Sequence, residues 1–232
     1  MEAIVLRPGE GETVTDEPES FVQIKAGLDE LAVTESRYSE GESGPGPHIH
    51  REHIDAFWVL DGELTFELGA GEVVKAPAET FVLVPPEVVH TFRNEGPGDA
   101  RFLNIHAPSR DFHRHLRGED VDFDTEDPPP DGGRPATEAI VRVNAGGGDA
   151  GGRLALMDTT LQPGFSGPAP HSRPGTVESF YVLAGVLTVR VNERTEECDR
   201  GTYLLMPPGN AYTLSNGGED PVRLLQLLVP VA

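Results

Sequence analysis

The chain contains two copies of one sequence pattern, and this repetition constrains its fold more than any other feature. SGPGPHIH at 43–50 aligns with SGPAPHSR at 166–173, and WVLDGELTF at 58–66 aligns with YVLAGVLTV at 181–189, both at an offset of 123 residues. VLVPPEVVHTFRNEG then aligns with LLMPPGNAYTLSNGG at an offset of 122, and EAIVLR aligns with EAIVRV at an offset of 136. A register kept over several blocks predicts two copies of one domain.

Both copies are predicted to be all-β. Their apolar residues fall in short runs rich in β-branched and aromatic side chains, separated by Gly, Pro, Asn or Asp, which is typical of a sandwich or barrel. One short helix is predicted at 109–117. Residues 118–135, GEDVDFDTEDPPPDGGRP, are so acidic and so rich in proline and glycine that they are predicted to be a linker without a core of its own.

The charge of the chain argues against two classes of partner. With 39 acidic and 18 basic residues, the formal net charge is −21, which would repel the phosphates of nucleic acids and of anionic membranes. No apolar run approaches the roughly 18 residues of a membrane span, and the N-terminus has no secretory pattern, so we expect a cytoplasmic protein. The single cysteine, Cys198, lies among acidic residues in EECDR, which disfavours a reactive thiolate.

A histidine-rich segment of the first copy indicates a metal site. His48 and His50 point to the same face if they lie on a strand, because side chains alternate there. Asp55 follows on the same segment, and His90 occurs further on in VPPEVVHTFRN. Three imidazoles and a carboxylate suit one divalent transition metal, Fe, Mn, Ni, Co, Cu or Zn, and the sequence does not select among them.

At these residues the sequence resembles the cupin superfamily, and the duplication resembles its double-barrel members, the bicupins. The residues that match the two motifs of the family are His48, His50, Asp55, Gly62, Pro85, His90 and Asn94. The resemblance implies two tandem barrels of the double-stranded β-helix or jelly-roll type: a metal-binding barrel at 1–117, the linker at 118–135 and a second barrel at 136–232.

The first copy departs from the family pattern mainly at Asp55, where the family has glutamate. Gly41 also stands one position early, and Glu79 and Glu87 replace glycines. Because aspartate is one methylene shorter, two arrangements are open: Asp55 binds the metal directly, or it hydrogen-bonds a water on the metal.

The second copy keeps the glycines and prolines of the motifs but loses two ligand positions. His171 and Glu178 remain, whereas Arg173 and Tyr212 replace histidines. Arginine has no lone pair for a cation, so this degenerate site is predicted to bind no metal, and Arg173 is predicted to pair with Glu178. The alternative is a metal-free pocket in which Arg173 and Tyr212 hold a small carboxylate.

Residues at even spacing from the ligands are predicted to form the substrate pocket: Phe57 and Val59 after Asp55, and Phe92 after His90. The alternative is that these three are ordinary barrel core. The four histidines outside the motifs are predicted to lie at the surface or in an interface: His53, His106, His113 and His115. The alternative for His106 is that it faces the pocket from the last strand of the first copy, although Leu228 occupies the matching place in the second copy.

Three functions fit these residues. The first is a metal-dependent dioxygenase, similar to quercetinase-type bicupins, that acts on a small aromatic or hydroxylated substrate, with Asp55 also serving as a base. The second is a cupin that binds a small molecule without turnover, and the third is a metal-dependent isomerase or decarboxylase, because one fold hosts many chemistries. A homodimer formed through strand edges is compatible with each of them.

Overall fold

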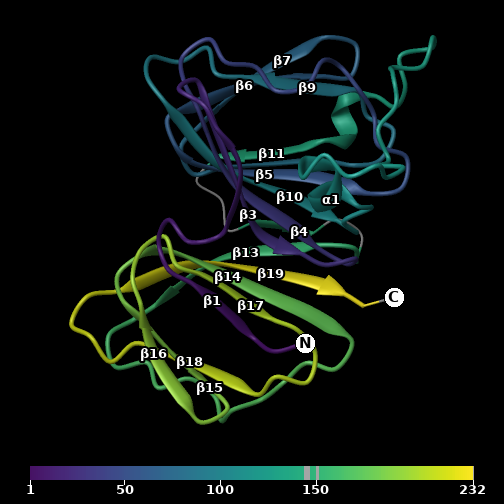
Figure 1. The fold of residues 1–232 in the computed structure, drawn as a ribbon. Coiled ribbons are helices and arrows are strands. Elements are labelled where there is room, and N and C mark those ends of the chain that lie inside the picture. The colour runs from purple at the N-terminus through teal and green to yellow at the C-terminus, as the bar shows by residue number, and fades with distance from the viewer. Residues whose placement is uncertain (144–146, 150–151, 232) are drawn as a thin grey trace. The chain divides into compact units, whose positions relative to one another are not determined.

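The computed structural model describes residues 1–143, 147–149 and 152–231. The chain divides into two compact units: Glu12–Arg153, which we call the N-terminal barrel, and Met1–Gly11 with Leu154–Ala232, which we call the C-terminal barrel. Strands are the main secondary structure of both units (Figure 1), so the predicted all-β fold with two tandem copies of one domain is confirmed. No helix among the described residues has the length and apolar character needed to cross a membrane.

The N-terminal barrel is built from two antiparallel sheets. The larger has the strand order β11-β8-β5-β10-β4-β3-β2, and the smaller has the order β7-β6-β9. The strands are β2 (Glu12–Asp16), β3 (Ser20–Gly27), β4 (Ala32–Tyr38), β5 (Ile54–Asp61), β6 (Glu63–Leu68), β7 (Glu72–Pro77), β8 (Thr80–Val84), β9 (His90–Arg93), β10 (Ala100–Ala107) and β11 (Ile140–Val143). The helix predicted at 109–117 is observed as α1, which is shorter and spans Phe112–Leu116. A 3-10 turn, η1, spans Ala136–Glu138.

The C-terminal barrel has the same plan. The strands that belong to this unit follow the order β1-β17-β14-β19-β13 in the larger sheet and the order β16-β15-β18 in the smaller one. The strands are β1 (Ile4–Leu6), β13 (Ala155–Leu161), β14 (Thr176–Ala184), β15 (Leu187–Val191), β16 (Arg194–Cys198), β17 (Tyr203–Met206), β18 (Tyr212–Ser215) and β19 (Val222–Pro230). A further short strand, β12 (Gly147–Asp149), lies in the connection between β11 and β13.

The two copies exchange one strand, which moves the boundaries of the units away from the predicted ones. Ile4 of β1 pairs with Leu205 of β17, and Ile140 of β11 pairs with Leu83 of β8. Residues 1–11 therefore belong to the C-terminal barrel, and residues 136–153 belong to the N-terminal barrel. The physical reason is that both EAIV segments offer the same apolar side chains to equivalent sheet edges, so spacing along the chain does not reveal which edge each one joins.

Residues 118–135 are part of the N-terminal barrel and not a free linker. The backbone of Glu126 pairs with Ile49, with both N···O distances at 3.0 Å, and Arg134 bridges to Val88. The composition of the segment correctly predicts that it has no core, but a segment without a core can still be held by hydrogen bonds to a barrel that is already formed.

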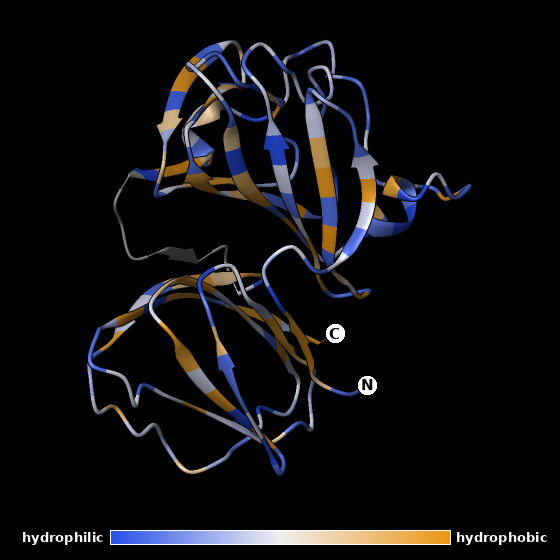
Figure 2. Cartoon of the chain, turned by 60° about the vertical axis from the view of Figure 1, so that its left-hand side comes forward, coloured by the Kyte–Doolittle hydropathy of each residue, from blue (hydrophilic) through white to orange (hydrophobic). Residues whose placement is uncertain are grey.

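Each barrel has its own hydrophobic core, and Figure 2 shows hydrophobic and hydrophilic bands alternating along several strands. In β9, for example, His90 and Phe92 are buried, whereas Thr91 and Arg93 are half-buried. Phe57, Phe66 and Phe92 meet in the core of the N-terminal barrel, with centroids of Phe57 4.9 Å from both other rings. Burying a side chain of this size contributes about 1.5–3 kcal/mol.

Candidate metal centre

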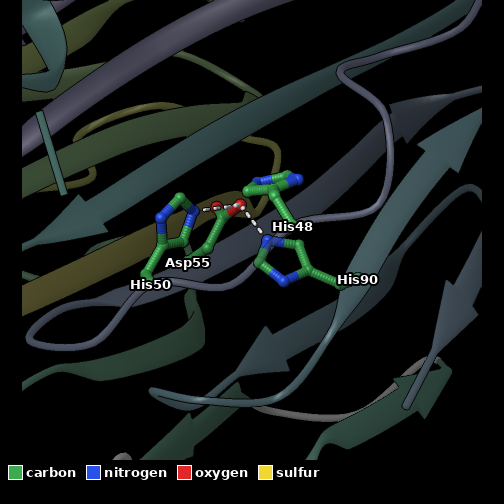
Figure 3. Close-up of side chains that lie close together, drawn as sticks. All are labelled: His48, His50, Asp55 and His90. Atoms are coloured by element: carbon green, nitrogen blue, oxygen red, sulfur yellow. Dashed lines mark hydrogen bonds and ion pairs between the residues drawn. The ribbon is translucent and has the colours of Figure 1, made fainter. Parts of the chain in front are cut away.

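The four side chains predicted to bind a metal lie together in the N-terminal barrel and could hold one ion (Figure 3). Asp55 lies on β5, His90 begins β9, and His48 and His50 lie in the segment that precedes β5. That segment is held by isolated bridges and not by a regular strand: His48 pairs with His90, with backbone N···O distances of 3.1 and 2.9 Å. The pairing brings the histidines of the two motifs side by side.

The spacing of the donor atoms fits a single ion. One ligand atom from each of the four residues lies within 4.8 Å of the others. Oδ2 of Asp55 is 3.1 Å from Nε2 of His90 and 3.8 Å from Nε2 of His50. Donors that surround one ion at about 2.1 Å lie roughly 3–4 Å apart. The shorter side chain of Asp55 therefore still reaches the cluster.

Hydrogen bonds to backbone carbonyls orient all three imidazoles. Nδ1 of His48 lies 2.8 Å from the carbonyl oxygen of Gly46, and Nδ1 of His50 lies 2.6 Å from that of Asp124. Nδ1 of His90 lies 3.0 Å from the carbonyl oxygen of Val88. Each Nδ1 must donate its hydrogen, which leaves Nε2 with a free lone pair, the usual arrangement in histidine metal ligands. Nε2 of His50 is buried without a hydrogen-bond partner, as expected for an atom reserved for a metal.

The protonation states also suit a cation. Burial, followed by the nearby His90 and His50, lowers the pKa of His48 to about 4. Burial alone would raise the pKa of Asp55, but the neighbouring imidazoles of His106, His50 and His90 outweigh it and hold this pKa well below its usual value. Neutral imidazole and ionised carboxylate are the forms that bind metals. The same low pKa makes Asp55 a weak base, which opposes the catalytic role predicted for it.

A chain of buried side chains that the sequence did not identify supports Asp55. Nδ2 of Asn104 donates to Oδ1 of Asp55, and Oδ1 of Asn104 lies 3.1 Å from Nε2 of His106. Nδ1 of His106 in turn lies 2.8 Å from Nε2 of His53. Both histidines are buried, so the prediction of a surface position for them is wrong. Spacing could not reveal this, because His53 precedes β5 and His106 lies on β10, and only the pairing of these strands brings them together.

The two remaining histidines differ from each other. His113 is buried and its Nδ1 lies 2.9 Å from Oγ of Ser109, so a surface position is wrong for it as well. His115 is exposed and stacks on Phe123. His50, His53 and His106 form a second cluster of potential ligands, but the rings of His50 and His53 are stacked with centroids 4.0 Å apart, so their lone pairs do not converge on one point.

A cavity of about 310 Å³ opens beside the candidate ligands His48, His50 and Asp55. Its aromatic walls include Phe92, Phe102, Phe112 and Phe123. The buried hydroxyl groups of Thr34 and Ser36 also line it, whereas no lysine or arginine of the described residues does.

Two of the three side chains predicted to line the substrate pocket do not reach this cavity. Phe92 lines it, as predicted. Phe57 and Val59 do not, because they lie further along β5 than Asp55, where the side chains fill the barrel interior.

In the C-terminal barrel the equivalent positions form a closed network. Oη of Tyr212 donates to Oε2 of Glu178 at 2.6 Å, and Nε2 of Gln226 donates to Oε1 at 2.9 Å. Nε of Arg173 lies 3.1 Å from the same Oε1, which confirms the predicted pairing of Arg173 with Glu178. Nδ1 of His171 still lies 3.2 Å from the oxygen of Ala169, as in its counterpart His48. The buried carboxylate is thus satisfied by protein groups alone.

The chain belongs to the cupin family. The family model described as "Cupin domain" matches residues 34–106 and again residues 157–229, one match in each copy of the repeat. No curated protein matches the chain.

Solved structures share the fold over nearly the whole chain. The protein Ylba from E. coli is 12% identical, with a TM-score of 0.72 over 98% of this chain and 90% of that one. The bacterial pirin YhhW from Escherichia coli, in complex with nickel(II), is 11% identical, with a TM-score of 0.69 over the full length of both chains. Oxalate decarboxylase from Bacillus subtilis is 12% identical, with a TM-score of 0.66 over 97% of this chain and 76% of that one. At these identities the likeness establishes the fold alone.

Proposed function

We propose that the N-terminal barrel is the active site of a metal-dependent, dioxygenase-type enzyme that acts on a small aromatic or hydroxylated molecule. The observation that carries the proposal is that a cavity with aromatic walls opens directly onto the candidate ligands His48, His50 and Asp55. A cavity of about 310 Å³ is at the small end of ligand pockets, so a ligand of one or two rings fits it best.

The side chains around the cavity favour a neutral ligand. An aromatic ring in the cavity would be contacted on its faces or edges by four phenylalanines. These are Phe92 of β9, Phe102 of β10, Phe112 of α1 and Phe123 of the acidic segment. Thr34 and Ser36 would hydrogen-bond a polar substituent. Because no lysine or arginine lines the cavity, a dicarboxylate would lack a cation to pair with its second carboxylate.

The residues of the chain divide the work as follows. His48, His50, His90 and Asp55 would hold the ion, which when bound would supply Lewis-acid and redox chemistry to a substrate oxygen. Asn104 would fix the orientation of Asp55, and the aromatic walls would exclude water from the reacting atoms. The low pKa of Asp55 favours its role as a ligand over its role as a base.

Oxygen uptake tests the proposal. The Fe(II) or Mn(II) form is mixed anaerobically with catechol-type substrates of one or two rings, and oxygen is then added. We expect substrate-dependent oxygen consumption that is lost in His90→Ala and kept in the variant of its non-ligating neighbour, Thr91→Ala. No consumption across a broad aromatic panel by protein that holds its metal would contradict the enzymatic proposal.

A further inference from the structure

The acidic segment supplies a short stretch, residues 122–126, that lies against the metal centre; we call it the strap. Glu126 anchors its end through backbone bonds to Ile49 and through a bidentate pair with Arg51, with both N···O distances at 2.6 Å. Phe123 lies in the cavity wall, with its ring centroid 5.6 Å from that of His50. The strap therefore contacts the His50–His53 loop along its length.

Asp124 makes the central contacts of the strap. Its carboxylate accepts the backbone N–H groups of Arg51 at 2.9 Å and Glu52 at 2.7 Å, and Oδ2 lies 2.9 Å from Nδ1 of the buried His53. Its backbone oxygen accepts the hydrogen of Nδ1 of His50 at 2.6 Å. One residue thus fixes both the loop that follows His50 and the ring of His50 itself.

His50 differs from the other two candidate ligands in where its support comes from. The carbonyls that orient His48 and His90 belong to residues two positions earlier in the chain, Gly46 and Val88. The carbonyl that orients His50 comes from 74 residues away. The first two rings are held by local backbone, whereas the ring of His50 is held only as firmly as the strap is docked.

We propose that Asp124 is a positioning residue of the metal centre: by docking the strap on the His50–His53 loop, it fixes the tautomer and orientation of His50 for the ion. This inference rests on the proposed metal role of His50. Carbonyl or carboxylate partners of a ligand imidazole contribute about 10–100-fold to metal affinity, because a ring that is already oriented loses less freedom on binding. Without the docked strap, the ring of His50 must be ordered by the ion when it binds.

The test is a competition titration of Co(II) or Zn(II) against a chromophoric chelator. Asp124→Ala is expected to weaken metal binding by about 10–100-fold. Asp124→Asn should bind with an affinity between those of the wild type and Asp124→Ala, because the amide oxygen can still accept one backbone hydrogen. The matched control is Asp122→Ala, which removes an exposed carboxylate of the same strap and should change the affinity by less than about threefold. If Asp124→Ala does not fold, Asp124→Asn carries the comparison.

A double-mutant cycle separates positioning from general structural support. If Asp124 acts through His50, the Asp124→Ala substitution should cause no further loss of metal affinity in a protein that already carries His50→Ala. An equal loss in both backgrounds, or unchanged affinity of both Asp124 variants, overturns the inference while leaving the proposed function intact. Failure of the wild-type protein to bind any of the metals overturns the proposed function and, with it, this inference.

Discussion

Tyr212 donates a 2.6 Å hydrogen bond to the buried carboxylate of Glu178, at the position where His90 meets Asp55 in the other barrel. The two copies thus solve one problem, a carboxylate inside a barrel, in two ways. In the C-terminal barrel Tyr212, Gln226 and Arg173 satisfy it. In the N-terminal barrel the neighbours of the Asp55 carboxylate are imidazoles whose Nε2 lone pairs are available to bind a cation.

Replacing the tyrosine tests this difference. Tyr212→Phe removes the hydroxyl and leaves Oε2 of the buried Glu178 without its donor, so we expect the free energy of unfolding to fall by about 1–3 kcal/mol. Urea denaturation followed by fluorescence measures the change. A control in the N-terminal barrel, Tyr38→Phe, removes a partly buried hydroxyl that makes no hydrogen bond to the described residues, and it should cost less. Equal stability of Tyr212→Phe and the wild type would show that this bond is not required.

An ion pair in the N-terminal barrel, between Lys25 and Glu35, predicts that replacing one partner costs more stability than replacing the other. The side chain of Lys25 is inaccessible and its Nζ lies 3.1 Å from Glu35, which also pairs with Arg101 at 2.5 Å. Glu35→Gln removes the carboxylate that balances the buried ammonium, which keeps its hydrogen bond to Gln23 at 2.6 Å, and should cost about 3–5 kcal/mol. Lys25→Met should cost less, because Glu35 keeps Arg101. Urea midpoints of the two variants decide the order, and the reverse order would contradict this account.

Cys198 is predicted to be inert in the folded protein. Burial is the main cause that raises the pKa of its thiol to about 11, so the thiolate is scarce at any pH below that value. A disulfide reagent at pH 8 should label the native protein very slowly and the urea-unfolded protein at the rate of a free thiol. Rapid stoichiometric labelling of the native protein would refute the predicted inertness.

The sequence predicts well which four side chains come together as candidate ligands, because their positions depend on local spacing and on a pattern that occurs twice in the chain. His48, His50, Asp55 and His90 come together as predicted. The roles of Asn104 and Asp124 could not be predicted, since each depends on contacts between segments far apart in the chain, 49 and 74 residues respectively.

Composition was misleading in one region. Residues 118–135 have the composition of a disordered linker, yet Asp124 is held by backbone N–H groups of Arg51 and Glu52. Composition reports whether a segment can bury apolar surface, and it does not report whether its carboxylates match donors on a neighbouring loop. The sequence does not predict the exchange of β1 and β11 either, since both segments contain the same apolar residues, EAIV.

The choice between direct and water-mediated binding at Asp55 has its own test. The distance of 3.1 Å from its Oδ2 to Nε2 of His90 places the carboxylate among the donors. Asp55→Asn should therefore weaken Co(II) binding by more than the roughly 10–100-fold typical of an outer partner. Glu178→Gln, the equivalent change in the C-terminal barrel, should leave the affinity unchanged. A loss of about 100-fold or less in Asp55→Asn would favour the water-mediated arrangement.

The metal content of purified, tag-free protein tests the central claim most directly. Elemental analysis of the wild type should give about one transition-metal ion per chain, as expected for a single His and carboxylate site. His50→Ala should lose the ion, whereas His171→Ala, at the position equivalent to His48 in the other copy, should retain it. Unchanged metal content in His50→Ala, or loss of the ion in His171→Ala, would contradict the assignment of the site to the N-terminal barrel.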